Sequence, residues 1–269
     1  MSLITNSKLF YINSRNRIEG TDSNFSYQFQ MPADIKFDHV CVMQMYIPKS
    51  YYLITAIETF TLTEGVNSIQ ITLPVGNYTR RSFASSLQLI LNTLSPHHYV
   101  YTITYPTSSL VGDNGKYTYS VTGNAGVQPI FTFVASNDVW DHMGFASASI
   151  NTFVASTLTS TQVINLQKEN TIFLHSDIAN NGSDNILQEV FSTQASDYSS
   201  IVFQQYNIDG YSKKIVGNLN NVYRFYLTDE SANQIDLNGQ NFNLTLLLYK
   251  KNNIYEMIKQ FLRLQASQK

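Results

Sequence analysis

The sequence predicts an all-β protein folded as an antiparallel sandwich or barrel, with one helix inserted between strands. Short runs in which apolar and polar residues alternate recur along the chain, which is the period of half-buried strands. Pairs of Gly, Asn and Asp separate these runs and supply the positive φ that tight hairpins need. Many short strands joined by turns are typical of a sandwich or barrel and not of βαβ units.

The expected strands follow one another closely in chain order. The first strong strand alternates Phe25, Tyr27 and Phe29 with polar residues, and an N-terminal arm precedes it. A longer apolar run over 35–47 ends at Pro48, which cannot donate to a sheet ladder. The remaining strands are expected at 59–63, 68–73, 99–105, 117–121, 130–134, 162–166, 171–175, 186–191, 201–205, 222–227 and 243–249.

One segment inside this series has the period of a helix. Thr79 can cap the N-terminus of a helix over 79–94, and Ser95 followed by Pro96 ends it. The helix carries one apolar stripe, so we expect it to pack on the sheet between the strands at 68–73 and 99–105. The stripe consists of Phe83, Leu87, Ile90, Leu91 and Leu94.

A second helical pattern lies at the C-terminal end, after the basic pair Lys250 and Lys251. A helix of about eleven residues is marginal alone in water, so it needs a surface to pack on. That surface is either the protein's own sandwich or a partner. The apolar face of this short C-terminal helix consists of Ile254, Met257, Ile258, Phe261 and Leu262.

Composition and charge limit the classes of function. Of the 269 residues, 13% are charged and 13% are aromatic. Either the protein is a β protein whose surface is largely covered by neighbouring proteins, or the composition reflects an AT-rich genome. The net charge is −2 and no basic stripe marks a nucleic-acid partner. No run approaches the roughly 18 apolar residues of a membrane span. Cys41, the only cysteine, excludes an intrachain disulfide and a Cys-based zinc site, and its apolar surroundings favour burial.

No motif commits the chain to catalysis. The nucleophile elbow, the Walker A loop, the H-E-x-x-H motif and the dinucleotide-binding glycines are all absent. Asp138, Asp141 and His142 cluster near the only tryptophan. They form either a metal site or a polar turn in which Trp140 and Phe145 pack inward. We expect a protein that is not an enzyme and that holds no metal or cofactor.

Four of the six arginines occur as two close pairs, which is unexpected in a chain poor in charge. On an extended chain Arg15 and Arg17 share one side, from which they can reach an acidic neighbour or backbone carbonyls. Arg80 and Arg81 fall in the first turn of the expected helix, where the helix dipole disfavours cations. Both pairs are either solvated charges or contacts with a partner, and we count them with the tail as candidate interface residues.

Six segments carry a resemblance through their order along the chain. They read YINSRNR with SNFSYQFQMP, MQMYIPKSYYLI, LPVGNYTRRSFASSLQLILN, WDHMGF, NTIFLHSDI and VYRFYLTDESANQIDLNGQNFNLTLLLY. In this order they resemble the penton (minor capsid) protein of virophages and Polinton-like viruses, of the double-jelly-roll capsid lineage. The resemblance covers most of the chain, and it rests on the order because each segment alone is short and degenerate.

The resemblance implies a single jelly roll of two four-stranded antiparallel sheets. Together with the two helical patterns, the expected fold is an antiparallel jelly-roll β sandwich with one inserted helix and a short C-terminal helix. One domain would span 1–269, with a tail at 253–269. The stretch from about 50 to 158 is longer than a minimal jelly roll needs, so it is either an insertion or an elaborated loop. The implied function is that of a structural protein forming homopentamers at the capsid vertices of an icosahedral virion, beside a double-jelly-roll major capsid protein. Synthesis in the host cytoplasm or a virus factory follows from the same resemblance.

Two other classes of function stay open. A jelly-roll module could bind a host receptor or glycan, with Tyr117 and Tyr119, or Tyr51 and Tyr52, stacking on sugars. The same tyrosines could instead pack in the core or between subunits. An enzyme on a jelly-roll scaffold, such as a cupin, needs clustered His and carboxylate ligands, which the five scattered histidines do not supply.

Overall fold

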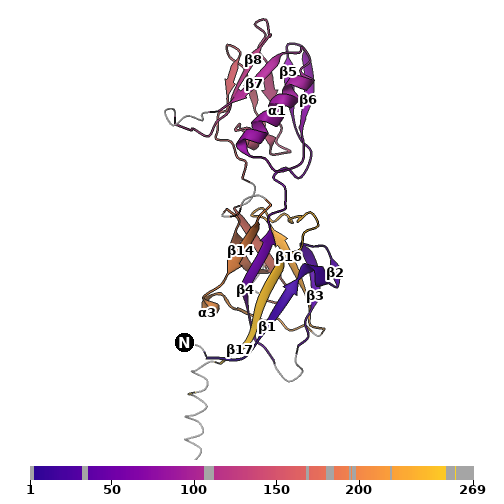
Figure 1. Cartoon of the computed structure of the whole chain (residues 1–269), viewed down its shortest axis with the longest axis vertical. Coiled ribbons are helices and arrows are strands. Elements are labelled where there is room, and N and C mark those ends of the chain that lie inside the picture. Colours follow the sequence, from indigo (N-terminus) through magenta and orange to yellow (C-terminus); the bar gives the residue numbers. More distant parts are fainter. Residues whose placement is uncertain are drawn as a thin grey trace, which may run out of the picture. The chain divides into compact units, whose positions relative to one another are not determined.

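The computed structural model describes residues 3–31, 36–105, 112–167, 170–179, 185–193, 195, 198–218, 220–252 and 258. The chain divides into two compact units (Figure 1). Unit 1 combines Met1–Tyr51 with Glu169–Lys269, and unit 2 is Tyr52–Lys168. Each unit has a hydrophobic core of its own. The stretch expected to be an insertion or an elaborated loop, from about 50 to 158, overlaps unit 2.

Unit 1 is an antiparallel β sandwich of two sheets. Its strands are β1 (Leu3–Asn13), β2 (Glu19–Gly20), β3 (Asn24–Gln28), β4 (His39–Pro48), β12 (Thr171–Ser176), β13 (Ile186–Phe191), β14 (Ser200–Gln204), β15 (Lys213–Lys214), β16 (Val222–Thr228) and β17 (Asn243–Asn252). One sheet has the order β1-β17-β4-β14, with β15 paired to β4, and the other has the order β13-β12-β16-β3-β2. Two short helices, η1 (Ser14–Asn16) and α3 (Ile208–Tyr211), connect strands.

The chain crosses between the two sheets of unit 1 in the order of a jelly roll. It passes from β1 to β3 in the opposite sheet, returns to β4, crosses to β12 and β13, returns to β14, and then alternates through β16 to β17. Two interlocked four-strand sets of this kind define the jelly roll. The predicted antiparallel jelly-roll β sandwich is therefore confirmed.

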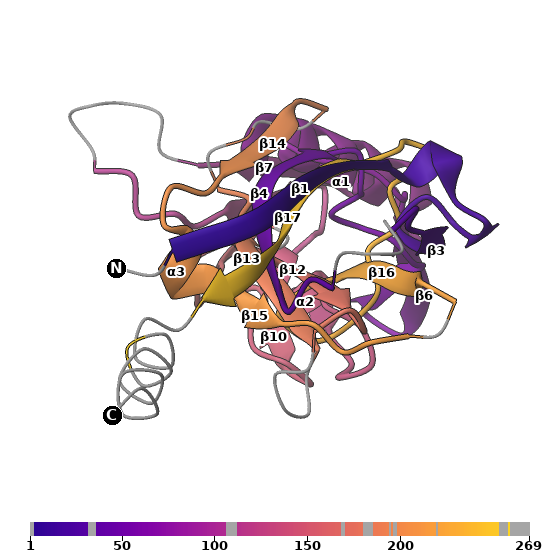
Figure 2. The same ribbon diagram turned by 90° about the horizontal axis from the view of Figure 1, so that it is seen from below.

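The first strand, β1, was expected only as an N-terminal arm, and it is an eleven-residue strand. It pairs with β17 from Leu3 opposite Asn252 to Asn13 opposite Asn243, with one irregularity between Thr5 and Ser7. Figures 1 and 2 show the two strands side by side. The alternation of β1 buries Phe10 and Ile12 in the core. Its sequence did not predict a strand because Asn6, Ser7 and Lys8 interrupt the apolar pattern.

Unit 2 is a smaller α+β unit. Its elements are β5 (Glu58–Glu64), β6 (Asn67–Leu73), α1 (Arg80–Leu94), β7 (Val100–Thr104), β8 (Thr118–Thr122), β9 (Ile130–Thr132), α2 (Val139–His142), β10 (Ile150–Thr152) and β11 (Thr157–Thr159). The strands form two sheets, β10-β9-β5-β6 and β11-β8-β7. Helix α1 lies against β7 and β6, as the sequence predicted (Figure 1).

The ends and the buried face of α1 follow from its sequence. Thr79 Oγ1 accepts a hydrogen bond from the Ser82 amide at 3.1 Å, and Ser82 Oγ accepts one from the Thr79 amide at 2.9 Å, which makes a reciprocal cap. The predicted stripe is confirmed for Phe83, Leu87 and Leu91, which are buried. Ile90 is half-buried and Leu94 is 36% exposed. The prediction for Leu94 was wrong because the helix ends there and the chain turns away.

The buried carboxylate of Glu64 holds the turn that follows α1 against the sheet through hydrogen bonds. Glu64, at the end of β5, is 0% exposed and accepts hydrogen bonds from Ser95 Oγ at 2.8 Å, the His97 amide at 2.9 Å and the Tyr101 hydroxyl at 2.6 Å. Burial and then the bond to Glu64 raise the pKa of Tyr101 well above its ordinary value. One side chain thus joins β5, the end of α1 and β7.

The strand predicted at 162–166 is wrong. Its backbone meets loops instead of a neighbouring strand: the Gln162 amide bonds the Gly144 carbonyl at 2.8 Å, and the Ile164 amide bonds the Gly115 carbonyl at 2.9 Å. An extended segment with such isolated bonds has no ladder to join. Four short strands, β2, β10, β11 and β15, were not predicted because two or three residues carry no clear period, whereas the equally short β9 lies within the strand predicted at 130–134.

We predict that Leu91→Ala lowers the free energy of unfolding of unit 2 by about 2–5 kcal/mol, because it leaves a cavity under α1. Leu89→Ala is the matched control, since Leu89 is 67% exposed on the same helix and should change stability by less than about 0.5 kcal/mol. Urea unfolding followed by circular dichroism measures both. Equal effects of the two substitutions would contradict the packing of α1.

Candidate assembly surfaces

Arg15 and Arg17 do not share one side of an extended chain, so that expectation was wrong. The chain turns there into η1, and Asn13 caps the turn by accepting the Arg15 amide at 2.8 Å. Arg17 folds back, and its guanidinium donates to the carbonyls of Gly20 at 3.1 Å and Ser14 at 3.0 Å. The Arg15 side chain is exposed and makes no hydrogen bond or ion pair with the described part of the chain.

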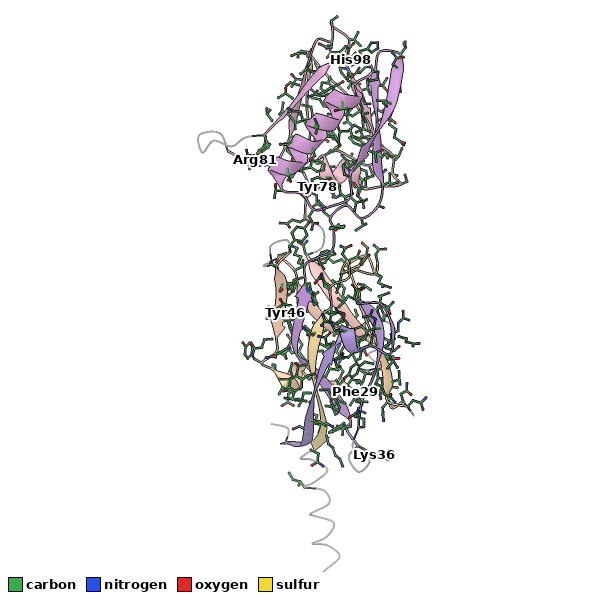
Figure 3. The ribbon with its side chains drawn as sticks, turned by 45° about the vertical axis from the view of Figure 1, so that its right-hand side comes forward. Phe29, Lys36, Tyr46, Tyr78, Arg81 and His98 are labelled. Carbon is green, nitrogen blue, oxygen red and sulfur yellow. The ribbon has the colours of Figure 1, made fainter. Side chains whose placement is uncertain are left out.

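The second pair, Arg80 and Arg81, also consists of one arginine bound within its own unit and one exposed arginine. Arg80 forms an ion pair with Asp113, donates to the Lys116 carbonyl at 3.3 Å and lies 4.5 Å from the ring centroid of Tyr105. The bond from Arg80 lowers the pKa of Asp113. Arg81, labelled at the start of α1 in Figure 3, is exposed and unpaired within the described residues. It borders a groove between α1 and β7 of about 360 Å³.

Each pair therefore contains one arginine that braces its own fold and one that is free for a partner. Arg15 and Arg17 belong to unit 1, whereas Arg80 and Arg81 belong to unit 2. Of the expected tail residues, Ile254, Met257, Phe261 and Leu262 lie outside the described residues. Ile258 is described and is 53% exposed.

The cluster around His142 is a buried ion pair. His142 and Glu58 are both buried, and Nε2 lies 3.4 Å from Glu58 Oε1 while Nδ1 lies 2.8 Å from the Asn165 carbonyl. Both neighbours only accept hydrogen bonds, so the doubly protonated imidazolium satisfies both ring nitrogens. Burial alone would lower the pKa of His142, but Glu58, the Asn165 carbonyl and Asp141 together raise it above 6.5.

The arrangement around this pair serves packing. Phe145 is buried, and Trp140 packs against the core of unit 2. Asp141 accepts a hydrogen bond from the Asn165 side chain at 2.7 Å instead of meeting His142. Among the described residues no three His, Cys, Asp or Glu side chains gather closely enough to hold a metal ion.

The tyrosines proposed for stacking on sugars are mostly inside the protein. Tyr117 and Tyr119 are 0% exposed and belong to the core of unit 2, and Tyr51 is 2% exposed. Burial raises the pKa of Tyr117 and Tyr119 well above that of a solvated phenol. Only Tyr52 is half-exposed. A stacking platform for sugars at these four positions is therefore not formed.

Several outward-facing aromatic residues of unit 1 were not predicted from the sequence. Tyr11 is 72% exposed, Tyr46 is 46% exposed and Phe191 is 64% exposed. Figure 3 labels Tyr46 on β4. The signal was present, because Tyr11 alternates with buried Ile12 and Tyr46 alternates with buried Met45 and Ile47.

The fold is similar to that of a solved viral protein. The crystal structure of the mavirus penton protein matches with a TM-score of 0.52 and 11% sequence identity, over 92% of this chain and 100% of that chain. The D2-D3 domains of the flagellar cap protein FliD from Escherichia coli match over 89% of this chain and 98% of that chain at 11% identity, but a TM-score of 0.19 carries no argument. No protein family and no curated protein matches the sequence.

The match to the mavirus penton protein supports the resemblance at the level of the fold. Because it covers 92% of this chain, it extends over both units. At 11% identity it shows a shared fold and nothing finer. No helix among the described residues is long and apolar enough to cross a membrane.

We predict that the His142–Glu58 pair makes unit 2 more stable in mild acid than at alkaline pH. A raised folded pKa means that the folded state holds the proton more tightly than the unfolded chain, so this stabilisation is complete below about pH 6.5 and is lost as the pH rises through the folded value. Thermal unfolding of the wild type and of His142→Gln across that range measures it. A constant difference between the two proteins would contradict the charged pair.

We also predict different effects from the two arginines of the first pair. Arg17→Ala should lower the free energy of unfolding of unit 1 by about 0.5–1.5 kcal/mol, because two carbonyls lose their donor. Arg15→Ala should change it by less than about 0.5 kcal/mol. Denaturant titration of both variants is the measurement. A larger loss for Arg15→Ala would show that the exposed arginine, and not Arg17, braces the turn.

Proposed function

We propose that this protein is a penton, the structural minor capsid protein at the vertices of an icosahedral virus particle. The observation that carries the proposal is the fold shared with the mavirus penton protein over 92% of this chain and the whole of that one. The order of the six sequence segments, which does not depend on the fold comparison, favours the same class of protein. Sequence and fold therefore support one function.

The surface of the protein supports an assembly role. Unit 2 keeps few free charges, since Glu58 and Glu64 are buried and Asp113 pairs with Arg80. The outward positions of its sheets carry hydroxyl side chains, as in the row of Thr104, Thr118 and Thr159 across β7, β8 and β11. Surfaces depleted in charge are typical of contacts between proteins.

The proposal includes the partners of the chain. Five copies form a ring at the fivefold axis and contact the double-jelly-roll major capsid protein through the termini. Arg15 is free for an acceptor on a neighbour, because Arg17 is already used within the turn. The tail at 253–269 leaves unit 1 from β17, next to the start of β1. We no longer propose Arg80 as an interface residue, because its guanidinium binds Asp113 and Tyr105 within unit 2. Arg81 stays among the proposed interface residues.

The proposed role is structural and not catalytic, and its location is the capsid vertex of the virion. A glycan-binding or receptor-binding function has less support, because Tyr117 and Tyr119 are buried. The direct test is localisation of the chain in purified particles by cryo-electron microscopy. We expect density for five copies at each fivefold vertex. Vertices occupied by another protein, or absence of the chain from the particle, would refute the function.

For the tail, we predict that deletion of residues 253–269 leaves the melting temperature of the monomer nearly unchanged and abolishes incorporation into particles. The reason is that a short amphipathic segment used by a partner adds nothing to the isolated fold. Differential scanning calorimetry and the composition of purified particles measure the two effects. Unfolding of the truncated chain would instead place the tail in the core of unit 1.

A further inference from the structure

At the centre of the outer face of the sheet β1-β17-β4-β14, none of the residues that the structure describes is charged. Directly paired residues on neighbouring strands place their side chains on the same side of a sheet. Tyr11 pairs with Thr245, which pairs with Gln44, which pairs with Gln204; beside this row Asn243 pairs with Tyr46, which pairs with Val202. We call this surface face A: Tyr11, Gln44, Tyr46, Val202, Gln204, Asn243 and Thr245.

Face A offers hydrogen-bonding groups that the fold does not use. The side chains of Gln44, Gln204, Asn243 and Thr245 make no hydrogen bond with the described part of the chain. They line a shallow groove of about 240 Å³ together with Tyr46 and Val202. Val202 is 71% exposed on the edge strand β14. Exposed tyrosine and the lack of charge match the central part of protein interfaces.

The outer face of the opposite sheet carries a stack of rings ending in a cation. The guanidinium of Arg224 lies 5.1 Å from the centroid of Tyr226. The Tyr226 ring stacks on His175 at 4.5 Å with 6° between the planes, and His175 meets Phe173 edge-on at 6.4 Å. Phe191 and Glu189, both on β13, are exposed on the same side, and so is Glu19, because Ser26 pairs with both Glu19 and Arg224. We call this surface face B: Phe173, Phe191, Arg224 and Tyr226; His175, which is only 8% exposed and lies 2.9 Å from Thr228 Oγ1, links two of its rings from within the sheet.

Arg224 has hydrogen-bond donors that no described residue uses. Its Nε donates to Asn24 Oδ1 at 2.8 Å, and its two terminal nitrogens meet no acceptor among the described residues. A guanidinium that stacks on an aromatic ring presents these donors in a fixed direction. Face B therefore supplies oriented donors and aromatic surface, whereas face A supplies unused amide and hydroxyl acceptors beside two tyrosines.

The geometry points to a contact between copies of this chain, in which face A of one copy packs against face B of the next. The two faces lie on opposite sides of one sandwich, so their pairing is head-to-tail, and a head-to-tail contact generates a ring when its rotation closes. Pairing of face A with itself would give a two-fold dimer and would leave the Arg224 donors unused. This inference takes only the number of copies in the ring, five, from the proposed function. The contact between the two faces can be tested without it.

The test uses the full-length protein and two substitutions on opposite faces. Val202→Glu places a charge in face A, and Arg224→Glu reverses the charge in face B. Val154→Glu is the matched control, because Val154 in unit 2 is 74% exposed, close to the 71% of Val202. Sedimentation velocity and native mass spectrometry give the size of each assembly, and circular dichroism checks folding. Gln204→Lys and Phe191→Glu replace the first two variants if either is misfolded.

We expect the wild type and the control to form the same ring, and each face variant alone to associate at least ten times more weakly. A mixture of the two face variants should form a heterodimer of twice the 30.5 kDa chain mass, because each variant retains one intact face. A monomeric wild type, a face variant that forms the wild-type ring, or a mixture without heterodimer would overturn the contact. A ring that behaves as expected but is absent from particle vertices would refute the penton function and leave the contact standing.

Discussion

The position of β17 constrains everything else in unit 1. The last strand lies between the first strand and β4, and it pairs with β1 across at least 230 positions of sequence. Its inward residues Leu244, Leu246 and Leu248 fill the centre of the core. The sandwich therefore cannot close until β17 has paired with β1 and β4. Closing a loop over so long a sequence separation is entropically unfavourable and slow.

This constraint explains why unit 2 has a core of its own. It is inserted between β4 and β12, ahead of the strands that complete the jelly roll. Its contacts are local in sequence, with α1 capped by Thr79 and fastened by Glu64 to the strands that flank it. Unit 1 fills its core from the inward faces of its sheets, and part of each outer face stays exposed, as at Val202 on one sheet and Phe191 on the other. These exposed parts are the surfaces that we assign to contacts between copies.

Periodicity in the sequence was sufficient for most strands and for α1, because burial on one face leaves a pattern that is local. Periodicity failed where long-range pairing decides the structure. Strand β1 was missed because Asn6 and Ser7 break its apolar pattern, and it is a strand because it pairs with β17. Conversely, the apolar stretch at 162–166 found no partner and formed no strand. The jelly-roll connectivity came from the family resemblance, since no local pattern encodes the order of strands in a sheet. The arginine pairs were noticed in the sequence, but which arginine of each pair stays free depends on tertiary contacts, those of Arg17 with two backbone carbonyls and that of Arg80 with Asp113.

Native-state hydrogen exchange of the full-length protein in increasing denaturant tests most directly whether β17 closes unit 1 independently of unit 2. We expect the amides of β1, β4 and β17 to become exposed together, with Leu244, Leu246 and Leu248 among the last of unit 1 to exchange. The amides of β5, α1 and β7 should open at a different denaturant concentration of their own. Exchange of β17 well before the rest of unit 1, or a single opening shared by both units, would contradict this role of β17.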